Sequence, residues 1–281
     1  MNNYYNYSIV IPYRDKYELF LKAIESIPDR EDIQIIIVDN ALQSLNEQQI
    51  PRKERAKVTY TTSSPVKGAG CARNMGLSRT EGKYLLFLDA DDYFSKDAFV
   101  SFDRYLAQTY DIVFFNADSV FLKDGSQSNR HTHIDKQIKC YLETGNDGAL
   151  RYGIVNPVAK LFNSSFILSN NIKFEETRVS NDVWFSMISG HYAKSIAADP
   201  AKVYIITEGD SGSSLTKKKD KENWFVRYQV MIRVNKFLRT VGKYQYHTRL
   251  SGFLIVALKE FGFKEFIRFL LYAIKNRASI F

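Results

Sequence analysis

Two short runs of almost uninterrupted β-branched and aliphatic residues constrain the fold of this chain more than any other feature. They are Tyr7–Pro12 (YSIVIP) and Ile33–Val38 (IQIIIV). A strand with one face in water alternates apolar and polar residues, so these runs indicate strands buried on both faces, as in a parallel sheet. The apolar residues between the runs recur at helical spacing, at Phe20, Ala23, Ile24 and Ile27. The start of the chain is therefore predicted to form a β-α-β unit.

The alternation of strand and helix patterns continues to about residue 118. Further strands are predicted at Val58–Thr61, Tyr84–Leu88 and Asp111–Asn116, and helices at Ala69–Leu77 and from Ser95 to about Gln108. Chains that alternate in this way form an α/β fold with an open, doubly wound sheet. Ligands bind in such sheets beyond the carboxyl ends of the strands, so the residues that follow each strand are the first candidates for a functional site.

Three carboxylates, Asp89, Asp91 and Asp92, follow the strand predicted at Tyr84–Leu88. Because residues two apart share a face of a strand, Asp89 and Asp91 are expected to converge on one point. At so short a distance, two ionised carboxylates repel each other, which raises the pKa of both. A divalent cation bound between them removes this repulsion. We therefore predict Mg²⁺ or Mn²⁺, held by these carboxylates and by substrate phosphates. The alternative is a turn in which Asp91 or Asp92 caps the next helix.

The composition indicates a globular protein. Of the 281 residues, 45% are hydrophobic and 14% aromatic, which suffices for one full core and a smaller appendage. There are two cysteines, Cys71 and Cys140, and the first residues lack the features of a secretion signal, so a cytoplasmic location is expected. The longest notable apolar run, Phe253–Leu258, is far shorter than the roughly 18 residues of a membrane-spanning helix.

Positive charge gathers near the C-terminal end of the chain. Residues 217–281 contain 15 lysines and arginines against four aspartates and glutamates, a net charge of +11, and residues 1–216 carry −3, which together give the total of +8. The pattern from Trp224 to Arg277 is helical. Its apolar stripe consists of Phe263, Phe266, Ile267, Leu270, Leu271 and Ile274, and Lys264, Arg268, Lys275 and Arg277 tend to the other side.

A basic, aromatic-rich amphipathic helix of this kind is suited to an anionic membrane surface, so a peripheral location on the inner face of the cell membrane is one expectation. The alternative is that the stripe packs on the rest of the chain or on a second copy in a homo-oligomer. Nucleic acid is not expected as a partner, because no recognition motif is present.

Elements along residues 7–216 resemble, in order, motifs of the family 2 glycosyltransferases, inverting enzymes of the GT-A fold that transfer a sugar from a nucleotide diphosphate. The matching elements are Ser8–Tyr13, Ile36–Asn40, Gly68–Leu77, Gly82–Asp92, Pro157–Phe162 and Asn181–Phe185. The resemblance implies a doubly wound mixed GT-A sheet in a catalytic domain over residues 1–216. Within it, residues 1–118 form a Rossmann-like half that binds the nucleotide sugar, and 119–216 form the acceptor half. Residues 217–281 follow as a basic helical extension.

The resemblance also implies roles for individual residues near the donor. Pro12 and Tyr13 line the nucleotide pocket, and Asp39 accepts a hydrogen bond from the base, usually uracil, so the donor is expected to be a UDP-sugar. Arg73 lies near the nucleotide. Asp89 and Asp91 hold the ribose and the Mn²⁺ or Mg²⁺ ion, with Asp91 the first choice of direct metal ligand. The alternatives are a strand-end turn for Asp39 and a surface ion pair for Arg73.

Asp182 is the predicted catalytic residue. An acceptor hydroxyl is too weakly acidic to attack an anomeric carbon unaided, so a carboxylate must take its proton as the new bond forms. The family usually has Glu-Asp at this position, and this chain has Asn181-Asp182, which retains the presumed base. The alternative is that Asn181 or Asp182 serves as a helix N-cap. Gly212–Thr216 resembles the family's flexible segment over the donor, and Lys217–Lys219 are candidates for phosphate contacts.

The resulting hypothesis is an enzyme that adds a sugar to a growing glycan on lipid or protein, in bacterial surface polysaccharide or glycoprotein synthesis. Two alternatives remain, a sugar nucleotidyltransferase and a non-catalytic nucleotide-sugar-binding subunit. The first would be expected to carry a glycine-rich loop after the first strand, where this chain has Pro12–Asp15. His131 and His133 lack a third ligand and are predicted to lie in a polar loop rather than bind metal. Trp184 either stacks on an acceptor sugar or packs in the core.

Overall fold

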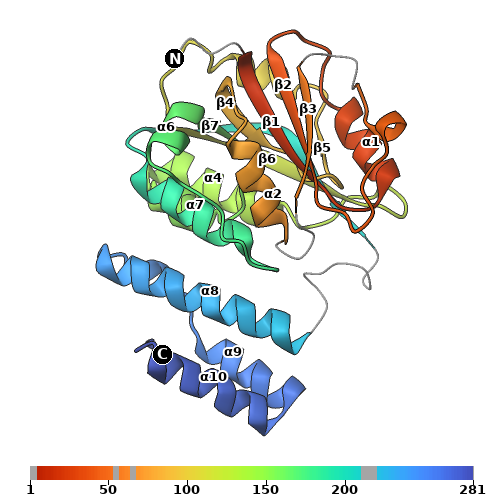
Figure 1. Ribbon diagram of the computed structural model, residues 1–281. Coiled ribbons are helices and arrows are strands. Elements are labelled where there is room, and N and C mark those ends of the chain that lie inside the picture. Colours follow the sequence, from red (N-terminus) through yellow and green to blue (C-terminus); the bar gives the residue numbers. More distant parts are fainter. Residues whose placement is uncertain (1–4, 53–56, 64–67, 210–219, 281) are drawn as a thin grey trace.

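The fold is an α/β domain with a mixed sheet, followed by a group of helices (Figure 1). The computed structural model describes residues 5–52, 57–63, 68–209 and 220–280. Within these residues the sheet has eight strands in the order β3-β2-β1-β4-β7-β6-β8-β5. They are β1 (Tyr5–Tyr13), β2 (Ile33–Asp39), β3 (Val58–Thr62), β4 (Gly82–Phe87), β5 (Tyr93–Phe94), β6 (Ile112–Phe121), β7 (Lys160–Asn163) and β8 (Ile196–Glu208).

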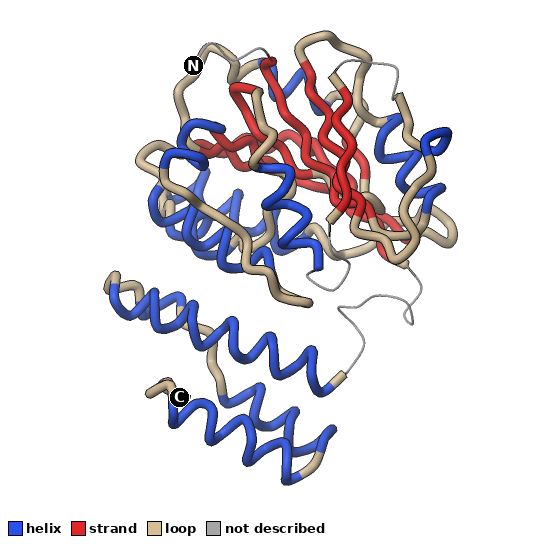
Figure 2. The backbone as a smooth tube through the Cα atoms, in the orientation of Figure 1, coloured by secondary structure: helices blue, strands red, loops and turns tan. Residues whose placement is uncertain are grey.

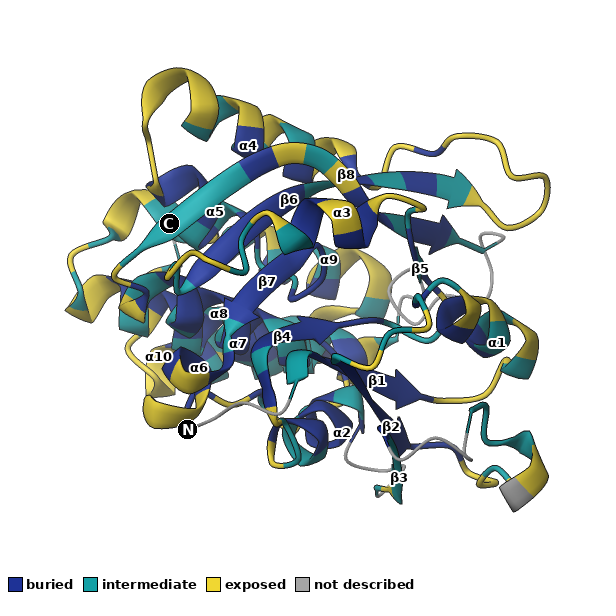
Figure 3. Ribbon diagram, turned by 90° about the horizontal axis from the view of Figure 1, so that it is seen from above, coloured by how far each residue is buried: buried dark blue, intermediate teal, exposed yellow. Residues whose placement is uncertain are grey.

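The four strands at one side of the sheet run parallel, and the remainder is mixed. β1 pairs in parallel with β2 and β4, and β2 pairs in parallel with β3. β7 runs antiparallel to both β4 and β6, whereas β8 runs parallel to β6. The carboxyl ends of β1, β2 and β4 therefore meet at one edge of the sheet. β1 and β2 are buried almost throughout, as the apolar runs predict, and Figure 3 shows the same for the central strands.

Helices cover both faces of the sheet (Figure 2). Those of the α/β domain are α1 (Tyr17–Glu25), α2 (Gly68–Leu77), α3 (Ala98–Asp103), α4 (Thr132–Thr144), α5 (Gly148–Gly153), α6 (Ser164–Ser169) and α7 (Asn181–Tyr192). The ring of Tyr7 in β1 packs on Phe99 and Phe102 of α3, and Val10 meets Gly76 of α2. Positions 7 and 10 of a strand point to opposite faces. α2 and α3 therefore lie on opposite sides of β1, and the doubly wound prediction is confirmed.

The described residues after 220 form helices that pack onto the α/β domain through α8 (Figure 1). These helices are α8 (Lys221–Thr240), α9 (Ser251–Val256) and α10 (Phe263–Lys275). One face of α8 packs against α5 and α7, where Val230, Val234 and Leu238 meet Val183 and Met187. Its other face packs on α9 and α10 through Tyr228 and Ile232. The region is thus docked on the α/β domain, although the boundary predicted at 216/217 falls outside the described residues.

This packing bears on two predictions about the outer helices. Trp184 of α7 meets Phe237 of α8 edge to face, with ring centroids 5.7 Å apart, so the core alternative is the one observed. The buried face of α10 is centred on Phe269 and Ala273, which were not in the predicted stripe. Of the predicted stripe, Phe266 and Leu270 are partly buried against this cluster, whereas Phe263, Leu271 and Ile274 are exposed. None of the helices in the described part of the chain is long and apolar enough to cross a bilayer.

Candidate active site

A cleft of about 740 Å³ opens beyond the carboxyl ends of β1 and β4. The N-termini of α2 and α7 and the end of β8 complete its walls, and α8 contributes Arg227. Five of the residues predicted from sequence line it, namely Pro12, Arg73, Asp89, Asp91 and Asp182. They come from segments up to 170 positions apart, so the cleft exists only in the folded chain.

The three carboxylates after β4 have different surroundings. Asp92 is buried, and its carboxylate accepts hydrogen bonds from the Tyr204 hydroxyl (3.0 Å) and the Thr207 backbone N–H (2.7 Å). Burial, with Asp89 and Asp91 nearby, raises its pKa well above the ordinary value. Asp92 thus fixes the end of β8 to this turn. It is not the helix cap that the turn alternative requires.

Asp91 faces the cleft with about half of its side chain exposed. Lys16 lies 3.7 Å from its carboxylate. Desolvation raises the pKa of Asp91, the charge of Asp89 raises it further, and Lys16 opposes both effects. The raised pKa means that the surroundings disfavour the ionised form of Asp91. A cation bound beside it in the cleft would remove this penalty.

Arg73 connects the acidic turn to α7. Its side chain is buried, and its guanidinium donates to Asp89 at 2.5 Å and to the Asn181 side-chain oxygen at 2.8 Å. Burial lowers the pKa of Arg73, but the charges of Asp89 and Asp182 outweigh it and the net shift is upward. Arg73 therefore forms a buried ion pair in the cleft wall, where the sequence alternative was a solvated surface pair.

Asp182 lies in the first turn of α7 and lines the cleft. The N-cap position belongs to Ser180, whose backbone is left-handed (φ 55°), so neither Asn181 nor Asp182 serves as the cap. Burial raises the pKa of Asp182, and the positive charges of Arg73 and Lys160 partly oppose that shift. Among the described residues, Asp182 forms no ion pair within 4 Å. Its carboxylate is thus a base of raised pKa that stands beside the acidic turn.

Asp39 organises the loop that follows β2. Its carboxylate accepts hydrogen bonds from the backbone N–H groups of Ala41 and Leu45 (2.9 and 2.8 Å) and from the Tyr60 hydroxyl (2.6 Å). The buried ring of Tyr13 packs on Phe20 with centroids 4.7 Å apart. Neither side chain is among the described residues that line the cleft. Their neighbours Pro12 and Asn40 do line it.

Several cleft residues were missed by the sequence reasoning. They are Lys16, Arg130, Arg178, Thr207 and Arg227. Lys16 has a local signal, because it follows the first strand closely, but the others stand in segments without a motif. The predicted donor-covering segment 212–216 and the lysines at 217–219 lie outside the described residues.

The glycines at the start of α2 allow close contact with the start of α7, which carries Asn181 and Asp182, and with the segment that precedes it. A Cβ at Gly70 would lie 2.1 Å from the Glu175 backbone oxygen and 2.9 Å from the Asn181 Cβ. We expect Gly70→Ala to destabilise the fold by about 1–3 kcal/mol, since backbone must move, and to slow catalysis. Gly252→Ala in α9 is the control, because its new methyl group meets nothing within 4 Å. Urea unfolding measures both, and equal stability of Gly70→Ala and wild type would contradict the expectation.

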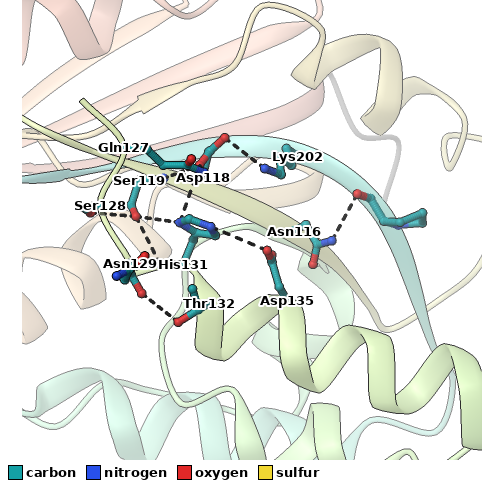
Figure 4. Close-up of polar contacts among 11 residues, drawn as sticks. Asn116, Asp118, Ser119, Gln127, Ser128, Asn129, His131, Thr132, Asp135 and Lys202 are labelled. Atoms are coloured by element: carbon teal, nitrogen blue, oxygen red, sulfur yellow. Dashed lines mark hydrogen bonds and ion pairs between the residues drawn. The ribbon is translucent and has the colours of Figure 1, made fainter. Parts of the chain in front are cut away.

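A second polar cluster surrounds His131, just before α4 (Figure 4). The His131 Nδ1 lies 2.7 Å from the Ser119 Oγ, and the carboxylates of Asp118 and Asp135 lie 3.6 and 3.8 Å from its two ring nitrogens. His131 is buried in the turn before α4, among polar side chains, whereas His133 belongs to α4, so the polar-loop prediction was wrong for His133. In the described part of the chain, no group of three His, Cys, Asp or Glu side chains is arranged to hold a metal ion.

The chain is similar to known proteins in sequence and in fold. The minor teichoic acid biosynthesis protein GgaB of Bacillus subtilis (strain 168) is 26% identical over 233 residues, which cover 79% of this chain and 25% of GgaB. The chain thus spans about a quarter of that relative's length. Staphylococcus aureus TarS 1-349 in complex with UDP-GlcNAc superposes with a TM-score of 0.67 at 18% identity, covering 96% of this chain and 81% of TarS 1-349.

A more distant structure has the same fold. The mannosyltransferase PcManGT from Pyrobaculum calidifontis, in complex with GDP-Man and Mn²⁺, superposes with a TM-score of 0.55 at 13% identity, covering 98% of this chain and 81% of that one. The model of the family named glycosyl transferase family 2 matches residues 8–166, more than half of the chain. The chain therefore belongs to glycosyl transferase family 2 and is a glycosyltransferase with the GT-A fold.

Proposed function

We propose that this enzyme transfers a sugar from a UDP-sugar to a glycan hydroxyl group with inversion at the anomeric carbon. One observation carries the proposal: Asp182 shares a cleft with Asp89 and Asp91, and Arg73 connects the two groups through Asn181. In this proposal Asp182 accepts the proton of the acceptor hydroxyl as it attacks. Its raised pKa supports the role, because it makes the carboxylate a stronger base. One such displacement inverts the anomeric centre.

We assign the nucleotide to the ends of β1 and β2, with Pro12, Tyr13, Asp39 and Arg73 as its surroundings. A carboxylate has about four acceptor sites, and Asp39 uses three of them within the protein. Asp39 itself is buried, and Asn40 of the loop that it holds in place lines the cleft, so this loop would present Asn40 to the nucleotide. Pro12 lines the cleft at this edge of the sheet. The UDP-GlcNAc complex of TarS supports a uridine nucleotide as the donor moiety.

The acidic turn fits a divalent cation that is shared with the substrate. Two cleft-lining carboxylates, Asp89 and Asp91, are present, and Mg²⁺ is commonly held by one or two carboxylates plus substrate phosphates. We infer that Asp91 and Asp89 would hold Mn²⁺ or Mg²⁺, which as a Lewis acid would stabilise the departing diphosphate. The presence of Mn²⁺ with PcManGT supports the choice of ion.

The acceptor is proposed to be a growing bacterial surface glycan on a lipid or protein carrier. GgaB, by its name, acts in minor teichoic acid biosynthesis, which supports surface polysaccharide as the product class. The sugar and the linkage position depend on the shape of the acceptor half, where residues 178–180 form part of the cleft wall.

A thermal-shift screen of nucleotide sugars, with and without Mn²⁺, tests the function. A ligand that binds only the folded form stabilises it, by about 2.7 kcal/mol at a ligand concentration of 100 times Kd. The melting temperature rises as a result. We expect a UDP-sugar to give this shift only with Mn²⁺ and to release UDP on incubation. Binding without UDP release would favour the non-catalytic subunit, and release of inorganic pyrophosphate from UTP and a sugar phosphate would favour the nucleotidyltransferase.

We further propose that α10 docks on an anionic membrane surface. One face of α10 packs on α8 and α9. On the rest of the helix, the side chains of Phe263, Leu271 and Ile274 are 69, 59 and 61% exposed. Basic side chains at Lys264 and Lys275 flank them. In an interfacial helix, apolar side chains enter the headgroup region of the membrane, and basic side chains beside them contact anionic lipid.

Replacing two of these side chains tests the membrane proposal in the intact chain, since truncation before α8 would uncover Val183 and Met187. We expect Phe263→Ser with Leu271→Ser to weaken flotation with phosphatidylglycerol vesicles at least about tenfold, because each apolar side chain contributes about 1.5–3 kcal/mol when buried. Leu142→Ser, at an exposed leucine of α4, is the control. Unchanged flotation would contradict the proposal, and a dimer of the wild type that dissociates in the double variant would assign the surface to a second copy.

A further inference from the structure

Each of the two cleft-lining carboxylates that the proposed cation would use is already paired with a basic side chain. Arg73 donates to Asp89 at 2.5 Å, and the Lys16 ammonium lies 3.7 Å from the Asp91 carboxylate. Both basic residues line the cleft as well. With these pairs in place, two positive charges balance the two negative charges of Asp89 and Asp91. A divalent cation that arrives alone would therefore meet carboxylates that are already neutralised.

The two ion pairs differ in how firmly the basic side chain is held. The side chain of Arg73 is 7% exposed, and it also donates to the Asn181 oxygen at 2.8 Å. The side chain of Lys16 is 48% exposed, and within the described residues its one ion pair is with Asp91. A lysine side chain is a flexible stem that ends in a compact charge. Arg73 is thus a fixed part of the cleft wall, whereas Lys16 is able to leave Asp91.

The backbone that carries Lys16 is unusual. Asp15 and Lys16 are both left-handed, with φ of 56° and 57°, a conformation that is costly for residues other than glycine. The Lys16 carbonyl accepts hydrogen bonds from the backbone N–H groups of Leu19 and Phe20 (3.1 and 3.2 Å), which begins α1, and Phe20 is buried in the core. The packing of α1 therefore fixes a strained turn at the cleft and places Lys16 beside Asp91. Strain that a fold retains at a ligand site is an indication of function.

We propose that Lys16 balances the charge of Asp91 in the absence of the cation and moves to the donor diphosphate when the cation and the donor bind. This proposal rests on the proposed function, because it takes Asp91 as a ligand of the cation. An ammonium group that stayed beside the same carboxylate would be repelled by the divalent ion. The diphosphate brings ionised oxygens, which accept hydrogen bonds from the Lys16 N–H groups. Lys16 thus couples the two ligands, because each then favours the binding of the other.

Two binding measurements on the full chain test this proposal. Electron paramagnetic resonance, which detects free Mn²⁺, gives the affinity for Mn²⁺ without nucleotide, and calorimetry gives the affinity for UDP at saturating Mn²⁺. We expect Lys16→Met to bind Mn²⁺ alone about two- to fivefold more tightly, the contribution of a half-exposed ion pair. It should bind UDP at least about tenfold more weakly, because a hydrogen bond between charged groups is lost.

Two further variants serve as controls. Lys16→Arg keeps the positive charge, so it should bind Mn²⁺ alone no more tightly than wild type and should retain most of the UDP affinity. Lys96→Met removes an exposed lysine five residues after Asp91 that is not among the described residues lining the cleft. It should leave both affinities unchanged. Thermal melts show whether each variant is folded, and methionine keeps the unbranched stem at the left-handed position.

The outcomes separate this proposal from the proposed function. If wild type binds UDP with Mn²⁺ and Lys16→Met changes neither affinity, the role of Lys16 is overturned and the donor site stands. Weaker binding of Mn²⁺ alone by Lys16→Met would also overturn it, because Lys16 would then not compete with the cation. Tighter Mn²⁺ binding with unchanged UDP affinity would overturn the move to the diphosphate. A wild type that binds no UDP in the presence of Mn²⁺ would refute the proposed function itself.

Discussion

Asp182→Asn is expected to lower the rate of sugar transfer by about 10²–10⁴-fold, the usual contribution of a positioned general base. The amide has nearly the same shape as the carboxylate but cannot accept the proton of an acceptor hydroxyl. The pH dependence carries a second signature. Because the pKa of Asp182 is raised, the wild-type rate should fall as the pH drops through a value above that of an ordinary aspartate. This acidic limb should be absent from the residual activity of Asp182→Asn.

Three measurements make this test specific. Transfer rates over a range of pH give the size of the effect, and a UDP thermal shift in the same variant reports whether the donor site is intact. Asp97→Asn is the matched control, since Asp97 is exposed and makes no side-chain cap at the start of α3. An Asp182→Asn enzyme that transfers sugar at the wild-type rate would exclude Asp182 as the base.

Asp91→Asn is expected to abolish the Mn²⁺-dependent thermal shift and to reduce transfer at least about 10²-fold, because a Lewis acid contributes several kcal/mol at a departing diphosphate. In the metal-free protein, by contrast, Asp91→Asn should not lower the melting temperature. The pKa of Asp91 is raised in the folded state, so ionised Asp91 disfavours folding at neutral pH, and this cost disappears as the pH falls through the raised pKa. The amide removes the cost at every pH, so the metal-free variant should melt no lower than wild type.

Asp92 supplies the contrast within the same turn. Asp92→Ala removes the acceptor of the Tyr204 hydroxyl and of the Thr207 N–H, and buried donors without a partner cost about 1–3 kcal/mol each. This variant should therefore melt well below wild type in metal-free buffer. Thermal melts of the two variants with and without Mn²⁺ decide the assignment. An undiminished Mn²⁺ shift in Asp91→Asn would show that the cation, if bound, uses other ligands.

Much of the catalytic core could be predicted from the pattern of residues. Strands β1, β2 and β4 are near-continuous apolar runs, and such runs have few alternatives to a buried parallel strand. Local prediction was weaker where the chain is irregular. The helix expected from Ser95 to about Gln108 is only Ala98–Asp103, and the preceding strand Tyr93–Phe94 was not expected, because its pairing with β8 is set by residues more than 100 positions away.

In the candidate site, too, some features could be predicted from the sequence and others could not. The motif residues Asp89, Asp91 and Asp182 were found because their chemistry depends on residue type and spacing, and the fold brings all three into one cleft. The different roles of Asp91 and Asp92 had no local signal, since the two carboxylates are adjacent in sequence. Their roles differ because Tyr204 and Thr207 of β8 approach only one of them.

By itself, then, the sequence determined the central strands, the acidic turn and the presence of a carboxylate, Asp182, at the start of α7, because these depend on apolar periodicity and on short motifs. Only the tertiary structure decided that Arg73 is a buried ion pair, that His131 has two carboxylates beside it and that Arg227 of the basic C-terminal helices enters the cleft. Each of these depends on side chains that come together from distant segments, and their energies arise from burial and charge at contacts that no local pattern encodes.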